Sequence, residues 1–268
     1  MQYTTTPMQH LPTSELSIMV DIIAVANQKG GIAKTTTTVH LAHYAAEELG
    51  QRVLLLDMDK QGSLSMSFPV EQGGLMASEI YVGATKAPGV YSPNISVVSA
   101  DRGLLAFEGK GPEEAKIFAR NVRALAAGYD LCLIDTPPGQ GWYLTAALAA
   151  ASKVLTPVSV GLYELAGVRE LMMTIHTIKT KGLNPGLRHI GILPSKVNTR
   201  SKDELAQLAQ LREAYPNVIL PVTINERTAV KKAIAQGKPV WQGTKGEGHL
   251  SAAREWRSAC RAILGDKA

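Results

Sequence analysis

The sequence predicts an α/β fold, a mostly parallel twisted sheet with helices on both faces. Short apolar runs rich in β-branched residues alternate with segments of helical spacing, the order that parallel strands with crossover helices require. These runs are apolar throughout, as expected of strands that are covered on both faces. With 268 residues, of which 45% are hydrophobic and 19% charged, the chain can bury a large core. The same composition excludes disordered, collagen-like and coiled-coil proteins.

The elements can be assigned in order along the chain. Residues 1–19 show little periodicity and are expected to form a flexible N-terminal extension. Residues 20–268 contain no repeat or low-complexity linker and are expected to form a single domain. Strands are predicted at 20–26, 53–56, 95–98, 131–134, 154–160, 190–193 and 218–220. Helices are predicted at 36–49, 112–127, 143–151, 162–181, 202–214, 226–236 and 249–264.

Composition also limits the compartment. Cys132 and Cys260 are too few and too far apart for a disulfide framework or a C-x-x-C site. The first 20 residues hold no Lys or Arg, and no apolar stretch reaches about 18 residues, so neither a secretory signal nor a transmembrane helix is expected. We therefore expect a cytoplasmic protein.

The net charge of +5 is unevenly distributed. Residues 186–202 contain four basic residues and residues 227–246 contain five, and neither window contains an acid. A basic C-terminal third on a mildly acidic remainder suggests a polyanionic partner. Scattered, solvated surface lysines are the alternative interpretation of the same pattern.

The segment Gln28–Thr36 follows the first predicted strand and opens the first helix, which is the context of a phosphate-binding loop. The backbone N–H groups of Gly30 and Gly31 could curl around phosphate oxygens. Lys34 could reach the β- and γ-phosphates, and the Thr35 hydroxyl could ligate Mg²⁺. A glycine-containing turn with no ligand is the alternative.

Two predicted strands end in carboxylates. Asp57 and Asp59 follow strand 53–56, and Asp135 follows strand 131–134. A carboxylate at the end of a strand beside a phosphate loop can hold a metal through water, and a second one can orient an attacking water. Each aspartate alone could cap a loop, but their combination with the Lys-Thr pair of the loop predicts a nucleotide site.

Several motifs resemble the ParA/MinD ATPases, P-loop proteins with a deviant Walker A loop. Lys29–Thr36 (KGGIAKTT) carries the family's lysine in the second loop position. Asp57–Gly62 (DMDKQG) resembles the D-x-D-P-Q-G segment, and Asp135–Pro138 (DTPP) resembles the Walker B ending. Arg227 followed by Gly237–Val240 resembles the C-terminal region of plasmid ParA proteins. The resemblance covers nearly the whole chain.

The resemblance implies ATP and Mg²⁺ as cofactors and assigns roles by position. Lys34 would bind the β- and γ-phosphates, Lys29 would reach the partner subunit's nucleotide across a two-fold axis, and Asp59 would position the hydrolytic water. The metal would be held by Thr35, Asp57 and Asp135. The nucleotide-binding set would be Lys29, Gly30, Gly31, Ile32, Ala33, Lys34, Thr35, Thr36, Asn198 and Pro221.

The resemblance further implies a ParA-like partitioning ATPase. An ATP-dependent homodimer would bind nucleoid DNA, and a ParB-like or ribbon-helix-helix centromere-binding protein would stimulate hydrolysis. About 20 residues before the first strand leave no room for a helix-turn-helix, so DNA binding is expected to be non-specific. The DNA-binding residues would be Arg200, Arg227, Lys231 and Lys232. Helix 249–264 could dock on a membrane, but packing on the protein's own core is favoured.

Ala33 departs from the glycine that the family has directly before the catalytic lysine. If this position needs a positive φ, the Cβ costs about 1 kcal/mol or more, and slow hydrolysis is expected. Two other functions therefore remain open: a nucleotide-gated binding switch with little catalysis, and a ParA-like protein that positions another cargo.

Overall fold

The computed structural model describes residues 20–83, 85–161, 164–242 and 246–266, so the predicted extension 1–19 lies outside the described residues. A seven-stranded sheet has the order β3-β4-β2-β5-β1-β6-β7. Neighbouring strands are parallel except that β3 is antiparallel to β4. The strands are β1 Asp21–Val25, β2 Val53–Asp57, β3 Gly89–Ser92, β4 Ile95–Val98, β5 Leu131–Asp135, β6 Lys153–Val158 and β7 Arg188–Pro194.

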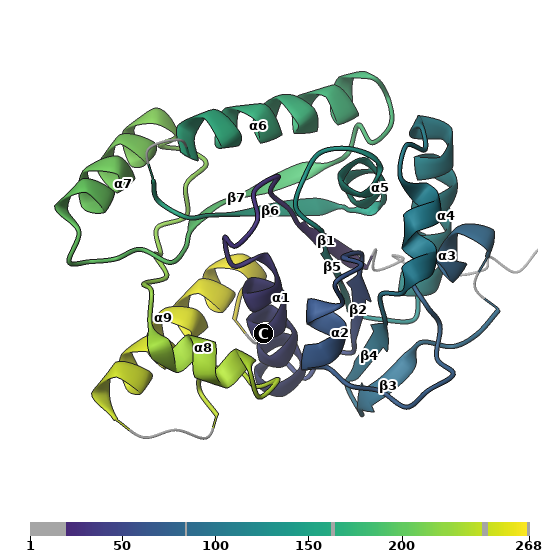
Figure 1. Ribbon diagram of the computed structural model, residues 1–268, viewed down its shortest axis with the longest axis horizontal. Coiled ribbons are helices and arrows are strands. Elements are labelled where there is room, and N and C mark those ends of the chain that lie inside the picture. The colour runs from purple at the N-terminus through teal and green to yellow at the C-terminus, as the bar shows by residue number, and fades with distance from the viewer. Residues whose placement is uncertain (1–19, 84, 162–163, 243–245, 267–268) are drawn as a thin grey trace, which may run out of the picture.

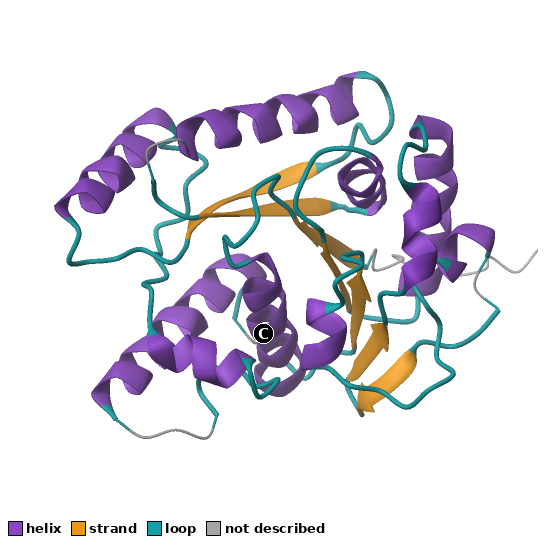
Figure 2. Cartoon of the chain, viewed as in Figure 1, coloured by secondary structure: helices purple, strands orange, loops and turns teal. Residues whose placement is uncertain are grey.

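Helices cover both faces of this sheet, which confirms the predicted fold class (Figure 1). The α-helices are α1 Lys34–His43, α2 Ser63–Ser67, α3 Glu79–Val82, α4 Pro112–Ala126, α5 Trp142–Ala150, α6 Glu164–Thr180, α7 Lys202–Ala214, α8 Thr228–Ile234 and α9 Glu247–Leu264. A π-helical turn η1 (Tyr44–Glu48) continues α1, and a 3₁₀-helix η2 (Arg102–Phe107) precedes α4. Figure 2 shows α4 to α7 on one side of the strands and α1, α8 and α9 on the other.

The alternation of side chains along each strand builds two cores. Ile22, Leu54 and Cys132 face the cluster that α4, α5 and α6 complete. Their neighbours Ile23 and Leu55 face the cluster that α1 and α9 complete. Because successive strand residues point to opposite faces, a strand covered on both faces must be apolar at every position. This explains the continuous apolar runs in the sequence.

The predicted strand 218–220 is wrong. This segment makes one isolated bridge, Ile192 to Ile219, and forms no strand. The amides of Val218 and Ile219 both donate to the carbonyl of Tyr215, so the segment leaves α7 as a tight turn. Pro221 then follows and has no N–H to continue a ladder.

Strand β3 and helices α2, α3 and η2 were not predicted from the sequence. Each has only four to six residues, too few to show a period. Strand β3 pairs only with β4 and lies at the edge of the sheet, which leaves Val90 exposed. Its side chains therefore lack the continuous apolar character of the buried strands.

Helix α9 packs on the core, as the favoured interpretation expected. Trp256 and Cys260 are buried in the cluster that α1 shares with the sheet. The arginines at 254, 257 and 261 lie on the outer side, where Arg257 pairs with Glu48. Among the described residues, no helix is both long and apolar enough to cross a bilayer.

Candidate nucleotide-binding site

The phosphate loop joins β1 to α1 at the carboxyl end of the sheet (Figure 1). Gly31 has φ 73° and Ala33 has φ 74°. Residue 33 therefore has the positive φ on which the expected cost of its Cβ was conditional, and a left-handed alanine costs about 1–2 kcal/mol. Ala33 is also the residue before α1, and its carbonyl accepts hydrogen bonds from the amide and hydroxyl of Thr37.

Lys34 lies inside this loop. Its ammonium donates to the carbonyl of Asn27 at 3.0 Å and to that of Lys29 at 2.7 Å. Burial lowers the pKa of Lys34, and the carboxyl groups of Asp135 and Asp59 partly oppose the shift. A buried, charged donor forms stronger bonds to phosphate than an exposed one, because water does not compete for it.

The Thr35 hydroxyl donates to Asp135 Oδ2 at 2.6 Å, and the Thr38 hydroxyl lies 3.4 Å from Oδ1. Asp135 ends β5 and is fully buried. Burial, reinforced by Asp57, raises the pKa of Asp135 to about 8. A hydroxyl beside a buried carboxyl group at a helix N-terminus is an all-oxygen set, which is what Mg²⁺ prefers. The residues present therefore fit the metal that the sequence predicts.

Asp57 and Asp59 play different parts. Asp57 is buried, and its two oxygens accept from the amide of Asp59 and from the amide and hydroxyl of Ser65. Asp57 therefore holds the loop that carries Asp59, and its assignment to the metal stays a prediction. Asp59 Oδ1 accepts from the amide of Gln61 at 3.0 Å. Its Oδ2 makes no hydrogen bond that the structure describes, so this oxygen can accept from water.

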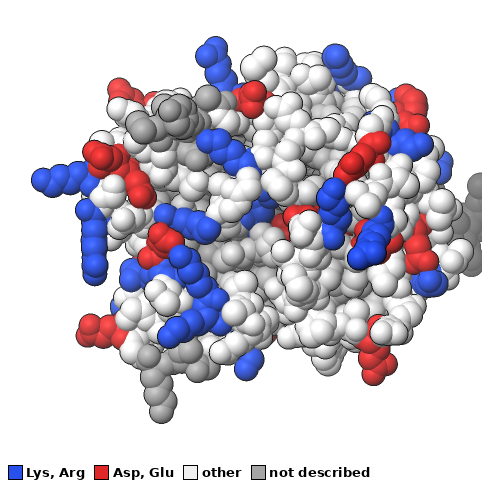
Figure 3. All heavy atoms as spheres, in the orientation of Figure 1, with Lys and Arg blue, Asp and Glu red and all other residues white. Residues whose placement is uncertain are grey.

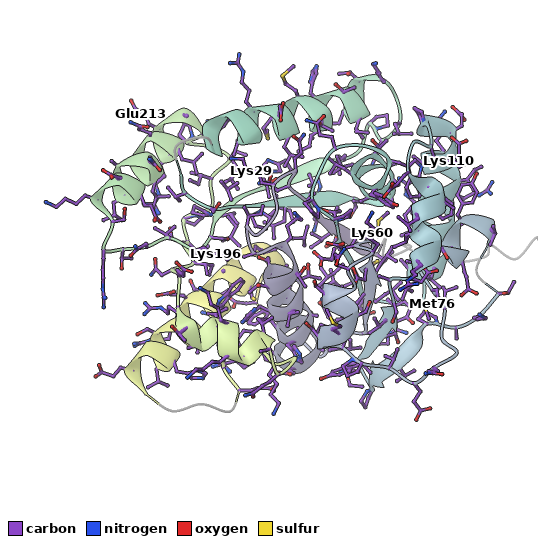
Figure 4. All side chains as sticks on the ribbon, in the orientation of Figure 1. Lys29, Lys60, Met76, Lys110, Lys196 and Glu213 are labelled. Atoms are coloured by element: carbon purple, nitrogen blue, oxygen red, sulfur yellow. The ribbon has the colours of Figure 1, made fainter. Side chains whose placement is uncertain are left out.

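The Lys29 side chain runs along α6. A Cβ placed on Gly167 would lie 3.4 Å from Lys29 Cε, so this glycine leaves room for the lysine stem. The Lys29 amide donates to Asn27 Oδ1 at 3.1 Å. Figure 4 shows Lys29 on the loop between β1 and α1, between the two helical layers.

A cavity of about 350 Å³ opens beside the phosphate loop at Ala33 and Thr36. Its other walls are Lys196, Ile224, Asn225, Glu226, Arg227, Val230, Lys231, Ile234, Ala235 and Trp256. The structure does not bring Asn198 or Pro221 to this cavity. Asn198 instead caps the connection to α7, where its Oδ1 accepts from the amide of Arg200, and Pro221 is exposed.

Arg227 and Lys231 are predicted from the sequence as DNA-binding residues, but the sequence does not predict that Lys196 and the segment 224–227 line a cavity beside the phosphate loop. The segment carries the signal of one apolar residue followed by three polar ones directly before α8. Four residues are too few to show a periodic pattern. The bridge between Val197 and Asn225 in the structure shows that segment 224–227 lies beside Lys196.

The four basic residues predicted to bind DNA fall into two classes. Arg227 forms an ion pair with Glu255 of α9, and Lys231 pairs with Glu226 at 2.7 Å. The side chains of Arg200 and Lys232 make no ion pair with any residue that the structure describes. Figure 3 shows Lys and Arg side chains gathered over the region of α8, with acidic side chains among them.

Comparisons of the sequence with known proteins identify a family model and several relatives. A family model described as an AAA domain matches residues 20–189. Protein IncC of Escherichia coli is 35% identical over 253 residues, which are 90% of this chain and 67% of that protein. The chromosome-partitioning ATPase Soj of Thermus thermophilus is 35% identical, over 82% of this chain and 87% of that protein.

Solved structures show the same fold. The ATP complex of a variant of Cyanothece McdA superposes with a TM-score of 0.81 at 20% identity, covering 93% of this chain and 98% of that one. Cobyrinic acid a,c-diamide synthase of Mycobacterium smegmatis with bound ADP and magnesium gives a TM-score of 0.72 at 25% identity, covering 92% and 94%. With a phosphate loop of deviant sequence in this fold and relatives such as Soj aligned along most of their length, the chain belongs to the ParA/MinD family of P-loop ATPases.

Proposed function

We propose that this protein is a partitioning ATPase that binds and hydrolyses Mg·ATP at the phosphate loop. The observation that carries the proposal is that Lys34 and the hydrogen-bonded Thr35–Asp135 pair lie together at the carboxyl end of the sheet. Lys34 binds the β- and γ-phosphates, and Thr36 contacts the α-phosphate. The nucleoside then occupies the adjoining cavity, since Thr36 lines it.

Thr35 and Asp135 hold the Mg²⁺, which when bound neutralises charge on the phosphates. Asp59 orients the attacking water through its Oδ2, and Asp57 positions Asp59 by accepting its backbone N–H at 3.0 Å. Catalysis of this kind depends on placement more than on covalent chemistry, so the rigid hydrogen bonds of Asp57 are part of the machinery.

The ATP-bound state is a homodimer in which Lys29 reaches the partner subunit's nucleotide. Two γ-phosphates facing each other need extra cations, which gives ATP a reason to favour the dimer. The dimer binds nucleoid DNA without sequence preference, and a centromere-binding protein of the ParB or ribbon-helix-helix kind stimulates hydrolysis and release. The relatedness to Soj and to the ParA proteins of Myxococcus xanthus and Caulobacter vibrioides supports this cycle.

DNA binding is expected to depend on Arg200 and Lys232, since neither forms an ion pair within the described part of the chain. Changing both to alanine should weaken ATP-dependent binding to arbitrary duplexes by about tenfold near 100 mM salt, because a protein that neutralises fewer phosphates releases fewer counterions. The slope of log affinity against log salt should fall by about 1 for each phosphate that is no longer neutralised. Fluorescence anisotropy over a salt series measures both quantities.

The matched control is a double change of Lys179 and Lys181, two exposed lysines at the C-terminal end of α6 that make no ion pair with any residue the structure describes. If the Arg200/Lys232 variant keeps the parental affinity and slope, these residues are ordinary solvated surface. Arg227→Ala is expected instead to lower thermal stability, because it removes the cation paired with the half-buried Glu255 and leaves that carboxylate with its hydrogen bonds from Asn225.

The left-handed alanine of the loop favours a second candidate, a nucleotide-gated switch that binds ATP but hydrolyses little. We expect Ala33→Gly to raise the steady-state rate of phosphate release by up to about tenfold, the ratio that about 1.4 kcal/mol of strain corresponds to. ATP affinity should stay within about twofold, since hydrolysis needs finer placement of the γ-phosphate than binding does.

The two candidates differ in one assay, phosphate release with DNA and a cognate centromere-binding protein added. A clear rise supports the partitioning ATPase. Tight ATP binding with no rise would favour the switch. A glycine variant with unchanged rate and affinity would show that the strain at residue 33 does not limit the reaction.

A further inference from the structure

Lys196 shares an unusual feature with Ala33. Among the residues that the structure describes, these two are the non-glycine residues with positive φ, 56° at Lys196 and 74° at Ala33. Both line the same cavity beside the phosphate loop. Left-handed backbone in residues other than glycine is costly and tends to persist where function requires it.

The backbone on both sides fixes this conformation. The amide of Ser195 donates to the carbonyl of Val158 at 2.7 Å, and the amide of Val197 donates to that of Ile224 at 3.0 Å. Ser195 and Val197 are both buried, so Lys196 is the residue between them that turns outward. Its ammonium reaches the phosphate loop and donates to the carbonyl of Gly31, 165 positions away in the sequence. Figure 4 shows Lys196 and Lys29 on neighbouring loops.

Other backbone carbonyls of the phosphate loop also accept hydrogen bonds. The carbonyls of Asn27 and Lys29 accept from Lys34, and that of Gln28 accepts from the amide of Gly139 at 2.6 Å. The carbonyl of Ala33 accepts from Thr37, and the carbonyl of Gly31 accepts from Lys196. In a trans peptide the carbonyl and the next N–H point in opposite directions. Holding the Gly31 carbonyl outward therefore aims the Ile32 N–H away from Lys196, toward the hollow where amides bind phosphate.

The orientation of the peptide between Gly31 and Ile32 depends on contacts such as the hydrogen bond from Lys196. Rotating this peptide changes ψ of Gly31 and φ of Ile32, and a glycine, which has no Cβ, permits the change in ψ more freely than any other residue. A rotated peptide would present a carbonyl oxygen to the phosphates in place of a donor.

Lys196 also interacts with Glu226. The hydrogen bond from Lys231 lowers the pKa of the Glu226 carboxyl group most, and the positive charge of Lys196 lowers that pKa further.

We propose that Lys196 is a positioning residue of the nucleotide site, a tether from the β7–α7 connection that sets the Gly31–Ile32 peptide for phosphate binding. The inference rests on the proposed function, because it presupposes that the loop binds ATP. Lys196 acts on the polyphosphate through the loop backbone, so ATP and ADP depend on it alike.

Three variants test this role. Lys196→Asn tolerates the left-handed backbone but is too short to reach Gly31. It should weaken ATP and ADP binding about tenfold in calorimetry, equivalent to about 1.4 kcal/mol. The thermal midpoint of the nucleotide-free protein should stay within about 2 °C of the parent. Lys196→Arg keeps a charged donor and should retain at least about a third of the parental affinity. Lys179→Asn, the same change at an exposed site of α6, is the control.

A Lys196→Asn protein that binds ATP and ADP as tightly as the parent would overturn the tether while leaving the proposed function intact. Failure of Lys196→Arg to restore affinity would also overturn it, because the role requires a donor. Failure of the parent itself to bind ATP would overturn the proposed function and the tether together. In steady state, the KM for ATP should rise with Lys196→Asn while kcat changes less, a split that loss of folded protein does not produce.

Discussion

Changing Lys34 to alanine is expected to abolish ATP binding, with an affinity loss of at least about a hundredfold. The Lys34 ammonium is buried in the loop and already positioned by the carbonyls of Asn27 and Lys29. Removing it costs the polyphosphate a charge-assisted contact of about 1.5–3 kcal/mol and takes away the nearest buried cation. Isothermal titration with ATP and with ADP measures the loss directly.

Lys29→Ala is the matched comparison, because Lys29 belongs to the same loop but its side chain lies against α6. This variant should bind ATP as a monomer with nearly parental affinity and lose the ATP-dependent dimer, which light scattering detects. Equal ATP affinity of Lys34→Ala and the parent would refute the phosphate-loop assignment. An unchanged dimer fraction in Lys29→Ala would refute the role across the two-fold axis and leave nucleotide binding untouched.

Changing His40 to alanine is expected to lower the free energy of unfolding by about 3 kcal/mol or more. His40 is completely buried and stacks on Trp256 with ring centroids 3.9 Å apart. Its Nδ1 donates to the carbonyl of Thr36 at 2.7 Å, and its Nε2 accepts the amide of Val240 at 3.1 Å. The substitution leaves a cavity and leaves the buried Val240 N–H without its acceptor, and each of these effects costs stability. Urea unfolding followed by circular dichroism measures the change.

The same histidine makes stability depend on pH. Burial lowers the pKa of His40 from 6.5 to about 3. Because the unfolded chain binds this proton more readily, the contribution to stability is complete above pH 6.5 and declines as the pH falls toward 3. Between pH 6.5 and pH 5 the decline is about 2 kcal/mol, at about 1.4 kcal/mol per pH unit. His189, whose pKa burial lowers to about 4, adds a decline of the same sign.

A His40→Gln protein separates this effect from general acid sensitivity, since glutamine does not titrate. Its stability should lie below that of the parent at pH 7, and the difference should shrink by about 2 kcal/mol by pH 5. If the two proteins lose stability in parallel over this range, His40 is not a source of the pH dependence.

Most strands of the sheet, the phosphate loop and the family could be predicted from the sequence, whereas strand β3 could not. Buried parallel strands must be apolar at each position, and a phosphate loop must combine glycines with Lys34 and Thr35, so both features are visible as local patterns. For Ala33 the cost of the Cβ could be stated from the sequence only on the condition of a positive φ, and the structure supplied that φ, 74°.

Contacts between residues far apart in the sequence could not be predicted and were found in the structure. Lys196 reaches Gly31, and His40 joins Thr36 to Val240, across separations of 165 and 200 positions that no local pattern encodes. The same holds for charge: Arg227 looked like a free surface cation in an acid-free window until α9 placed Glu255 against it. Local sequence specifies backbone preferences and burial, whereas pairing depends on how helices pack across the sheet, a property of the whole chain.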